Sequence, residues 1–343
     1  MDALHTAAGF RMDHINFAAV ITALAHVWEA ARRNDRFRAH AGTPDKLEAL
    51  HQRYVQSLRP LLADMAAQQL STVLWSSAKL GLNPDTAVPE MVHGMTLRFL
   101  NLIDVVEVKQ LPNAQNLANV LWGLATMRHP AATTELVDTV CLRFARLTRR
   151  ADTKQRPTAQ NAANMLWALA ILGHPAAAEV VDAVCLRFAR LIQHSDAKQR
   201  PNAQEAANVL WALATMGHPA AAEVVNAVCL HFARLTQHAD AKQRPNAQNT
   251  ANVLWALATM GHPAAPEVLD LVTTHFAHLL GSTNAKQWPD TQEVANVVWA
   301  LGTLKHTPPD DRLLDAFLAY FHVLLRREDQ RTRPDAQSIA NTF

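Results

Sequence analysis

The sequence has few of the features that favour β-structure, membrane insertion or export. It contains only 10 Gly and 2 Tyr among 343 residues, and no stretch alternates polar with β-branched residues as a half-buried strand does. No apolar run reaches the length needed to cross a membrane. The first residues, MDALHTAAGFRMDHINF, lack the basic and then apolar segments of a signal peptide. We therefore expect a helical protein that does not associate with membranes.

Cysteine is also scarce, and the charges nearly balance. A formal net charge of +2 neither requires nor excludes nucleic acid. Cys141, Cys185 and Cys229 are 44 residues apart. Equivalent positions on stacked helices lie roughly 8–10 Å apart, whereas a disulfide needs Cα atoms within about 7 Å. We expect buried, reduced thiols in an intracellular, reducing compartment, although secretion without a signal peptide or targeting to an organelle stays open.

The sequence does contain tryptophan at a nearly constant spacing. The intervals are 47, 45, 44, 44 and 44 residues, between Trp75, Trp122, Trp167, Trp211, Trp255 and Trp299. The surrounding text is nearly the same each time, as in NAANMLWALAILGHP and EAANVLWALATMGHP. Such a period is typical of stacked repeat proteins, which build elongated binding surfaces. The pattern predicts an all-α fold, an α-solenoid of stacked helical hairpins with a period of about 44 residues.

One unit, residues 198–240, indicates why the repeat forms a hairpin. Asn202 is a good N-cap, because its side-chain oxygen can accept from the first free backbone N–H groups. Gly217 suits the left-handed residue that ends a helix. Pro219 suits the first turn of a second helix, which is amphipathic. We expect the first helix to be packed between neighbours, with its Trp in the core, because apolar residues cover most of its circumference.

The first helix keeps one thin polar line, which we expect on the concave face of the solenoid. In each unit a Gln and an Asn four residues apart share this line, and therefore one helix face. The Gln residues are Gln115, Gln160, Gln204, Gln248 and Gln292, and the Asn residues are Asn119, Asn164, Asn208, Asn252 and Asn296. The residue after each Gln varies between units, which suits either discrimination between ligands or capping of the first turn.

Basic residues recur in the loops before the first helices, where they could contact phosphates. They are Lys154, Arg156, Lys198, Arg200, Lys242, Arg244 and Lys286. Trp288 replaces the Arg of this loop in the sequence KQWP, and an exposed Trp could stack on a base. The same cations could equally be ordinary solvated loop residues.

The ends of the chain depart from the repeat. We expect residues 1–57 to form a degenerate N-terminal capping repeat with a charged connection, because terminal repeats are commonly atypical. Residues 58–330 form the helical-hairpin repeats, and 331–343 begin a further, truncated repeat that stops just before its Trp position. This favours a fragment of a longer protein over a closing lid.

The segment NAQNTANVLWALATMGHP resembles the octotricopeptide repeat family, helical-hairpin proteins of algal organelles that also occur in some bacteria. The resemblance covers roughly residues 60–343, and ANVLWALA is its most specific part. It implies binding of specific RNA segments and control of RNA stability or translation. The units here are longer than the family's repeat, and its proline-rich signature is reduced to HP.

These patterns favour single-stranded RNA binding along a groove lined by the Gln and Asn residues, with the basic loops as its rim. Amides offer both donors and acceptors to base edges, and helical repeats can read one base per unit. Two alternatives remain. The amides could bond to the neighbouring backbone or to each other and fix helix stacking, or the solenoid could be a protein–protein interaction scaffold.

An enzyme is the least favoured reading. The histidines that attract attention all belong to the HP dipeptide after a first helix, namely His129, His174, His218 and His262. A catalytic set is a unique constellation rather than a period. Ligands one repeat apart are too distant to share a zinc ion at about 2.0–2.3 Å. We expect no enzyme activity, no metal, no cofactor, and a monomer.

Overall fold

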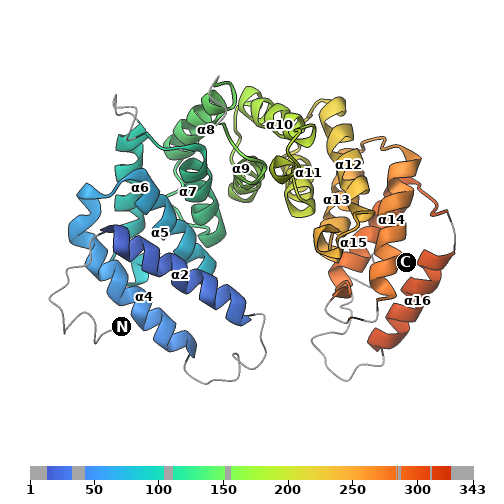
Figure 1. Ribbon diagram of the computed structural model, residues 1–343, viewed down its shortest axis with the longest axis horizontal. Coiled ribbons are helices and arrows are strands. Elements are labelled where there is room, and N and C mark those ends of the chain that lie inside the picture. The colour runs from blue at the N-terminus through green and yellow to red at the C-terminus, as the bar shows by residue number, and fades with distance from the viewer. Residues whose placement is uncertain are drawn as a thin grey trace. The chain divides into compact units, whose positions relative to one another are not determined.

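The computed structural model describes residues 14–32, 43–103, 111–150, 156–282, 284, 287–309 and 311–325. These residues form α-helices joined by loops and short 3-10 turns, without any strand, which confirms the expected all-helical fold (Figure 1). The helices are α2 (His14–Arg32), α4 (Thr43–Leu58), α5 (Ala67–Leu80), α6 (Met91–Ile103), α7 (Ala114–Met127), α8 (Thr134–Thr148), α9 (Ala159–Leu172), α10 (Ala178–Ile192), α11 (Ala203–Met216), α12 (Ala222–Thr236), α13 (Ala247–Met260), α14 (Pro266–Leu280), α15 (Thr291–Leu304) and α16 (Arg312–Leu325).

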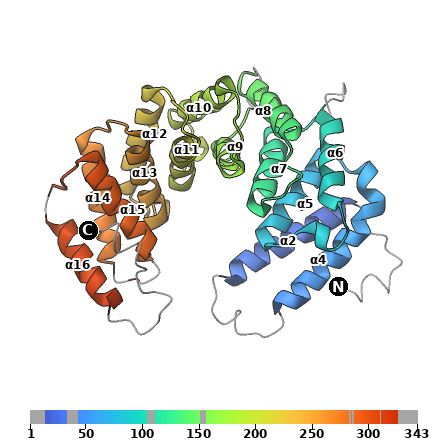
Figure 2. The same ribbon diagram turned by 180° about the vertical axis from the view of Figure 1, so that it is seen from behind.

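The chain divides into two compact units. The N-terminal unit comprises residues 1–157 and 171–176, and the C-terminal unit comprises residues 158–170 and 177–343. In the N-terminal unit α2 packs on α5, α5 on α7, and α6 on α8. In the C-terminal unit α11 packs on α13 and α13 on α15, while α10, α12, α14 and α16 pack in succession (Figures 1 and 2). Each unit is therefore built from helices that pack consecutively, in two layers.

We call α5, α7, α9, α11, α13 and α15 the A helices, and α6, α8, α10, α12, α14 and α16 the B helices. Side-chain caps explain where the A helices begin. In α11 the Asn202 Oδ1 accepts from the Glu205 N–H at 2.9 Å, and Glu205 Oε2 accepts in return from the Asn202 N–H at 2.9 Å. Four further A helices begin with the same reciprocal pair, at Asn113–Asn116, Thr158–Asn161, Asn246–Asn249 and Asp290–Glu293. The variable residue after each Gln is therefore a capping residue.

Left-handed residues end the A helices. Gly217 has φ of 61° and Gly261 of 60°, and the N–H of Gly217 reaches back to the carbonyls of Leu213 and Ala214. This confirms the helix stop predicted from glycine. Arg128 and Lys305 take the same conformation with φ of 49° and 53°, although they carry side chains. The end of an A helix therefore imposes this left-handed conformation on its C-cap residue even where the sequence lacks glycine.

The B helices contribute the largest buried side chains. Phe144, Phe188, Phe232 and Phe276 have no exposed surface. The three cysteines are also buried and free, as expected, and burial raises the pKa of each thiol to about 12. A core of aromatic and thiol side chains thus lies between the two helix layers.

The expectation that the tryptophans belong to the core was wrong. Trp211 and Trp255 are partly exposed, and Trp299 keeps 40% of its surface accessible. Ala and Leu side chains already fill the contacts between successive A helices, as Ala207, Leu210 and Leu213 do in α11. On the circumference of an A helix the Trp position lies next to the polar line of Gln and Asn, so the ring lies along the edge of that line.

Some expectations fall on residues that the structure does not describe. The truncated repeat at 331–343 lies outside the described residues, as does most of the charged connection. The boundary predicted at residue 330 also lies outside them, whereas the one predicted at residue 57 falls at the end of helix α4; both stay predictions.

Candidate nucleic-acid interface

The ten predicted Gln and Asn side chains all lie at the surface of the A helices. We call these five pairs the amide stripe: Gln115 and Asn119, Gln160 and Asn164, Gln204 and Asn208, Gln248 and Asn252, and Gln292 and Asn296. Every Gln is exposed and every Asn is partly exposed. The last three pairs lie on α11, α13 and α15, which pack in succession within the C-terminal unit. They form neighbouring rungs on one helix layer.

Most of the amide stripe is not used to hold the fold together. Gln292 Nε2 donates to Asn296 Oδ1 at 2.9 Å. Within the part of the chain that the structure describes, the other eight side chains make no hydrogen bond to protein atoms. A structural role predicts bonds to the backbone or between amides, and these are found in one pair out of five. The amide donors and acceptors are therefore available to a ligand.

Aromatic rings border the amide positions. In the N-terminal unit the rings of Trp75 and Trp122 lie 6.2 Å apart at 41°, and the Lys79 Nζ lies 5.6 Å from both ring centroids. This cation–π arrangement leaves both rings partly exposed. The rings at the rim therefore offer flat apolar surface beside polar groups, a combination that suits unstacked bases.

The arginines of the loops have a local role as well as a charge. Arg200 Nε donates to the His194 carbonyl and Arg244 Nε to the His238 carbonyl, both at 2.7 Å. Arg156 makes the same bond six residues back, to the Arg150 carbonyl. Each bond closes the loop and uses only the Nε–H, so the terminal guanidinium nitrogens can still contact an anion.

The described lysines of the same loops are exposed as well. Lys198 and Lys242 lie in short turns, with their backbone N–H groups bonded to Asp196 and Asp240 at 2.9 Å. Their side chains extend into solvent. Lys154 and Lys286, also predicted to contact phosphate, lie outside the described residues.

Trp288 takes over the loop bond of the arginine that it replaces. Its Nε1–H donates to the Ser282 carbonyl at 2.6 Å, again six residues back. Its ring meets Tyr320 edge to face, with centroids 6.2 Å apart. The half-buried ring has a structural task that the sequence did not reveal, and the base-stacking role stays a prediction.

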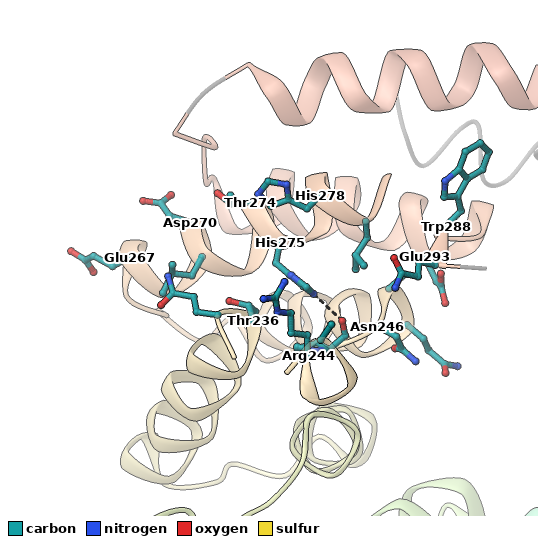
Figure 3. Close-up of a pocket in the computed structure, with 18 residues that line it drawn as sticks. Thr236, Arg244, Asn246, Glu267, Asp270, Thr274, His275, His278, Trp288 and Glu293 are labelled. Carbon is teal, nitrogen blue, oxygen red and sulfur yellow. Dashed lines mark hydrogen bonds between the residues drawn. The ribbon is translucent and has the colours of Figure 1, made fainter. Parts of the chain in front are cut away.

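Two grooves lie between the loops and the B helices of the C-terminal unit. The first, which we call the α12 groove, has a volume of about 590 Å³ and lies between the loop before α11, helix α12, and the loop before α13 with the first turn of α13. The second, the α14 groove, has a volume of about 1070 Å³ and is lined by the corresponding residues one unit later (Figure 3). The expected binding region thus contains hollows that periodicity alone did not predict.

A buried histidine lines each groove. The Nε2–H of His231 donates to the Pro201 carbonyl at 2.7 Å, and that of His275 donates to the Pro245 carbonyl at 2.8 Å (Figure 3). Burial lowers the pKa of both histidines, and nearby cations add to this effect. Tyr320 donates to the Pro289 carbonyl in the same way. These residues anchor each loop to the B helix of its own helical hairpin.

The HP histidines connect successive helical hairpins. His174 Nε2 lies 2.8 Å from Asp138 Oδ1, and His218 Nε2 lies 2.9 Å from Asp182 Oδ1. His262 pairs with Asn226 at 2.8 Å. Sequence reasoning placed these histidines at helix junctions but missed their partners. The recurrence of Asp138, Asp182 and Asn226 every 44 residues was the available signal.

Neither a metal site nor a membrane span was found in the described ranges. They hold no group of three or more His, Cys, Asp or Glu residues that could bind a metal ion. None of their helices is both long and apolar enough to cross a bilayer.

No protein-family model matches the chain, and no curated protein sequence matches it.

Proposed function

We propose that the chain is an α-solenoid of helical hairpins, repeating about every 44 residues, that binds single-stranded RNA along the amide stripe. The observation that carries this proposal is the exposure of the ten amides, eight of which make no hydrogen bond within the described residues. It is also the function that the octotricopeptide resemblance implies. The amides would bond to base edges, and the Trp rings at the rim would stack on the bases.

The same geometry supports binding with little sequence preference. The stripe amides are identical in every unit, and an amide can present either a donor or an acceptor to a base. The residue that varies, such as Asn249 or Glu293, closes a capping box and is therefore not free to read a base. We expect affinity for many single-stranded sequences rather than a code of one base per unit.

The test replaces two rungs of the stripe. A variant with Gln204, Asn208, Gln248 and Asn252 changed to Ala should bind a fluorescein-labelled oligouridylate more weakly than the original chain. Its helicity and melting temperature should be nearly unchanged, because these side chains make no bond to the protein. A collapse in melting temperature would instead support a structural role for the amides.

A protein-interaction scaffold is the second candidate, because a different surface favours it. Leu142, Leu186 and Leu230 occupy the same position of successive B helices and expose 52%, 47% and 43% of their surface. Isolated exposed leucines are common, but their repetition suits a helical or extended protein partner. A flat response of RNA binding to salt, or no RNA binding at low salt, would favour this candidate.

We also propose that the chain has no catalytic activity and needs no cofactor. The recurring histidines bind the neighbouring unit through Asp or Asn side chains, as His174 and His218 do. Their repetition supplies several equivalent structural contacts and no unique set of reacting groups. A monomer remains our expectation, to be checked by light scattering.

A further inference from the structure

The α12 groove brings cations together without a carboxylate among its lining residues. Arg200 and Arg244 come from the loops on its two sides, Lys242 from a turn, and Arg234 from helix α12. All four side chains are exposed. Gln204 of the amide stripe also lines this groove, so the groove adjoins the proposed base-binding surface. The charge is concentrated where a nucleic-acid backbone would pass.

The α14 groove has the same architecture, but its described lining residues include fewer cations and more carboxylates. His278 stands at the position of Arg234, Trp288 at that of Arg244, and Glu293 at that of Asn249. Glu267 and Asp270 add two further carboxylates, seen at the opposite side of the groove from Trp288 and Glu293 in Figure 3. Among the described residues, three carboxylates line this groove together with Arg244, which also lines the α12 groove, while Lys286, at the position of Lys242, lies outside the described residues. The two grooves therefore form a natural pair for comparison.

The cations of the α12 groove are not neutralised by the protein. Among the described residues, none of the four makes an ion pair with a carboxylate. Arg200 and Arg234 both lie close enough to His231 to lower its pKa, in addition to the larger effect of burial. Clustered cations repel each other, and a bound polyanion would relieve that repulsion.

We propose that the α12 groove binds the phosphodiester backbone of single-stranded RNA, and that it does so more tightly than the α14 groove. This inference rests on the proposed function and adds the phosphate site to it. Arg200 and Arg244 keep their terminal nitrogens available while the Nε–H holds the loop in place. A guanidinium fixed in this way can form two parallel bonds to one phosphate, and Lys242 supplies a point charge. Arg234 is the contact that sequence analysis missed.

The first experiment removes cations singly from the original chain. Arg234→Ala and Lys242→Ala should each weaken binding of the labelled oligouridylate about five- to tenfold at low salt and weaken other RNA sequences equally. Each should also reduce the slope of log affinity against log salt by about 0.7. His278→Ala, at the equivalent position of α14, should change neither quantity. Lys305→Gln controls for net charge, because Lys305 lines neither groove.

The second experiment makes the α14 groove resemble the α12 groove at two positions. Trp288→Arg combined with Glu293→Asn restores the residues that serve one unit earlier. The loop bond and the capping box should survive, since Arg244 and Asn249 already make them. The double variant should bind the oligouridylate about five- to tenfold more tightly and steepen the salt slope by about 0.7. Melting curves check that every variant is folded.

The outcomes separate the two proposals. If the original chain binds RNA but Arg234→Ala and Lys242→Ala bind it equally well with the same salt slope, the phosphate site is wrong and the proposed function stands. If the original chain does not bind RNA at low salt, the proposed function fails. Inorganic phosphate that competes with the oligouridylate far beyond a chloride control of equal ionic strength would show that the groove selects free phosphate, which would overturn the backbone assignment.

Discussion

Among single residues, buried histidines make the stability of the fold depend on pH. His51 of α4 has no exposed surface, and its Nε2 lies 2.9 Å from Ser77 Oγ of α5. Its Nδ1 has no hydrogen-bond partner among the described residues. Burial lowers the pKa of His51 from 6.5 to about 4. The imidazole must therefore be neutral for the fold to keep its full stability.

Acidification should destabilise the N-terminal unit through this residue. Because the folded pKa lies below the unfolded one, the contribution is complete above about pH 6.5 and is lost as the pH falls towards 4. The full loss corresponds to about 3 kcal/mol. Urea unfolding of the original chain should show this decline, and His51→Gln should flatten it. An equal decline in both proteins would place the acid sensitivity elsewhere.

The partly exposed tryptophans should matter more for binding than for folding. Trp211→Ala should cost about 1–2 kcal/mol of unfolding free energy, since only part of the ring is removed from water. Phe232→Ala, which removes a side chain with no exposed surface, should cost about 3–5 kcal/mol. The Trp variant should lose affinity for RNA while remaining folded. Equal losses of stability in the two variants would return Trp211 to the core.

At the scale of helices, the sequence predicted where the A helices begin and end better than which of their faces are buried. Asn202 and Gly217 act through local hydrogen bonds and local backbone conformation, so their roles could be read from one unit. The exposure of Trp211 and the anchoring of Pro201 by His231 depend on neighbouring helices and on the path of the loop. These contacts join residues that no single helical wheel brings together, which explains why sequence analysis missed them.

The close packing of A helices predicts opposite effects for two glycines. In α7 a Cβ on Gly123 would lie 3.0 Å from the backbone C and O atoms of Leu74, whereas around Gly302 in α15 there is open space. Gly123→Ala should therefore destabilise the protein by about 1–3 kcal/mol, despite the better helix propensity of Ala. Gly302→Ala should stabilise it by about 0.5–1 kcal/mol. Chemical denaturation measures both, and stabilisation by Gly123→Ala would contradict the packing of α5 on α7.

For the whole molecule, consecutive packing means that each helix depends mainly on the equivalent helices of the preceding and following hairpins. In the C-terminal unit α13 contacts α11 and α15, and α12 contacts α10 and α14. The periodic sequence predicted this organisation. It did not predict the change in charge between successive grooves, because that change depends on which loop faces which B helix. In a stack of this kind stability is approximately a sum over units and the interfaces between them.

Such a stack should tolerate the removal of one whole helical hairpin. Deletion of residues 203–246 removes 44 residues and joins Asn202 to Ala247, so that α13 follows the loop that normally precedes α11. The shortened chain should remain helical and melt cooperatively, because α13 presents nearly the same faces as α11. It should bind RNA more weakly, since one rung and the α12 groove are lost. Deletion of residues 203–224 removes α11 but leaves most of α12 without it, and should abolish cooperative melting. If both deletions unfold the protein equally, as judged by circular dichroism, the chain is not a solenoid of equivalent 44-residue units.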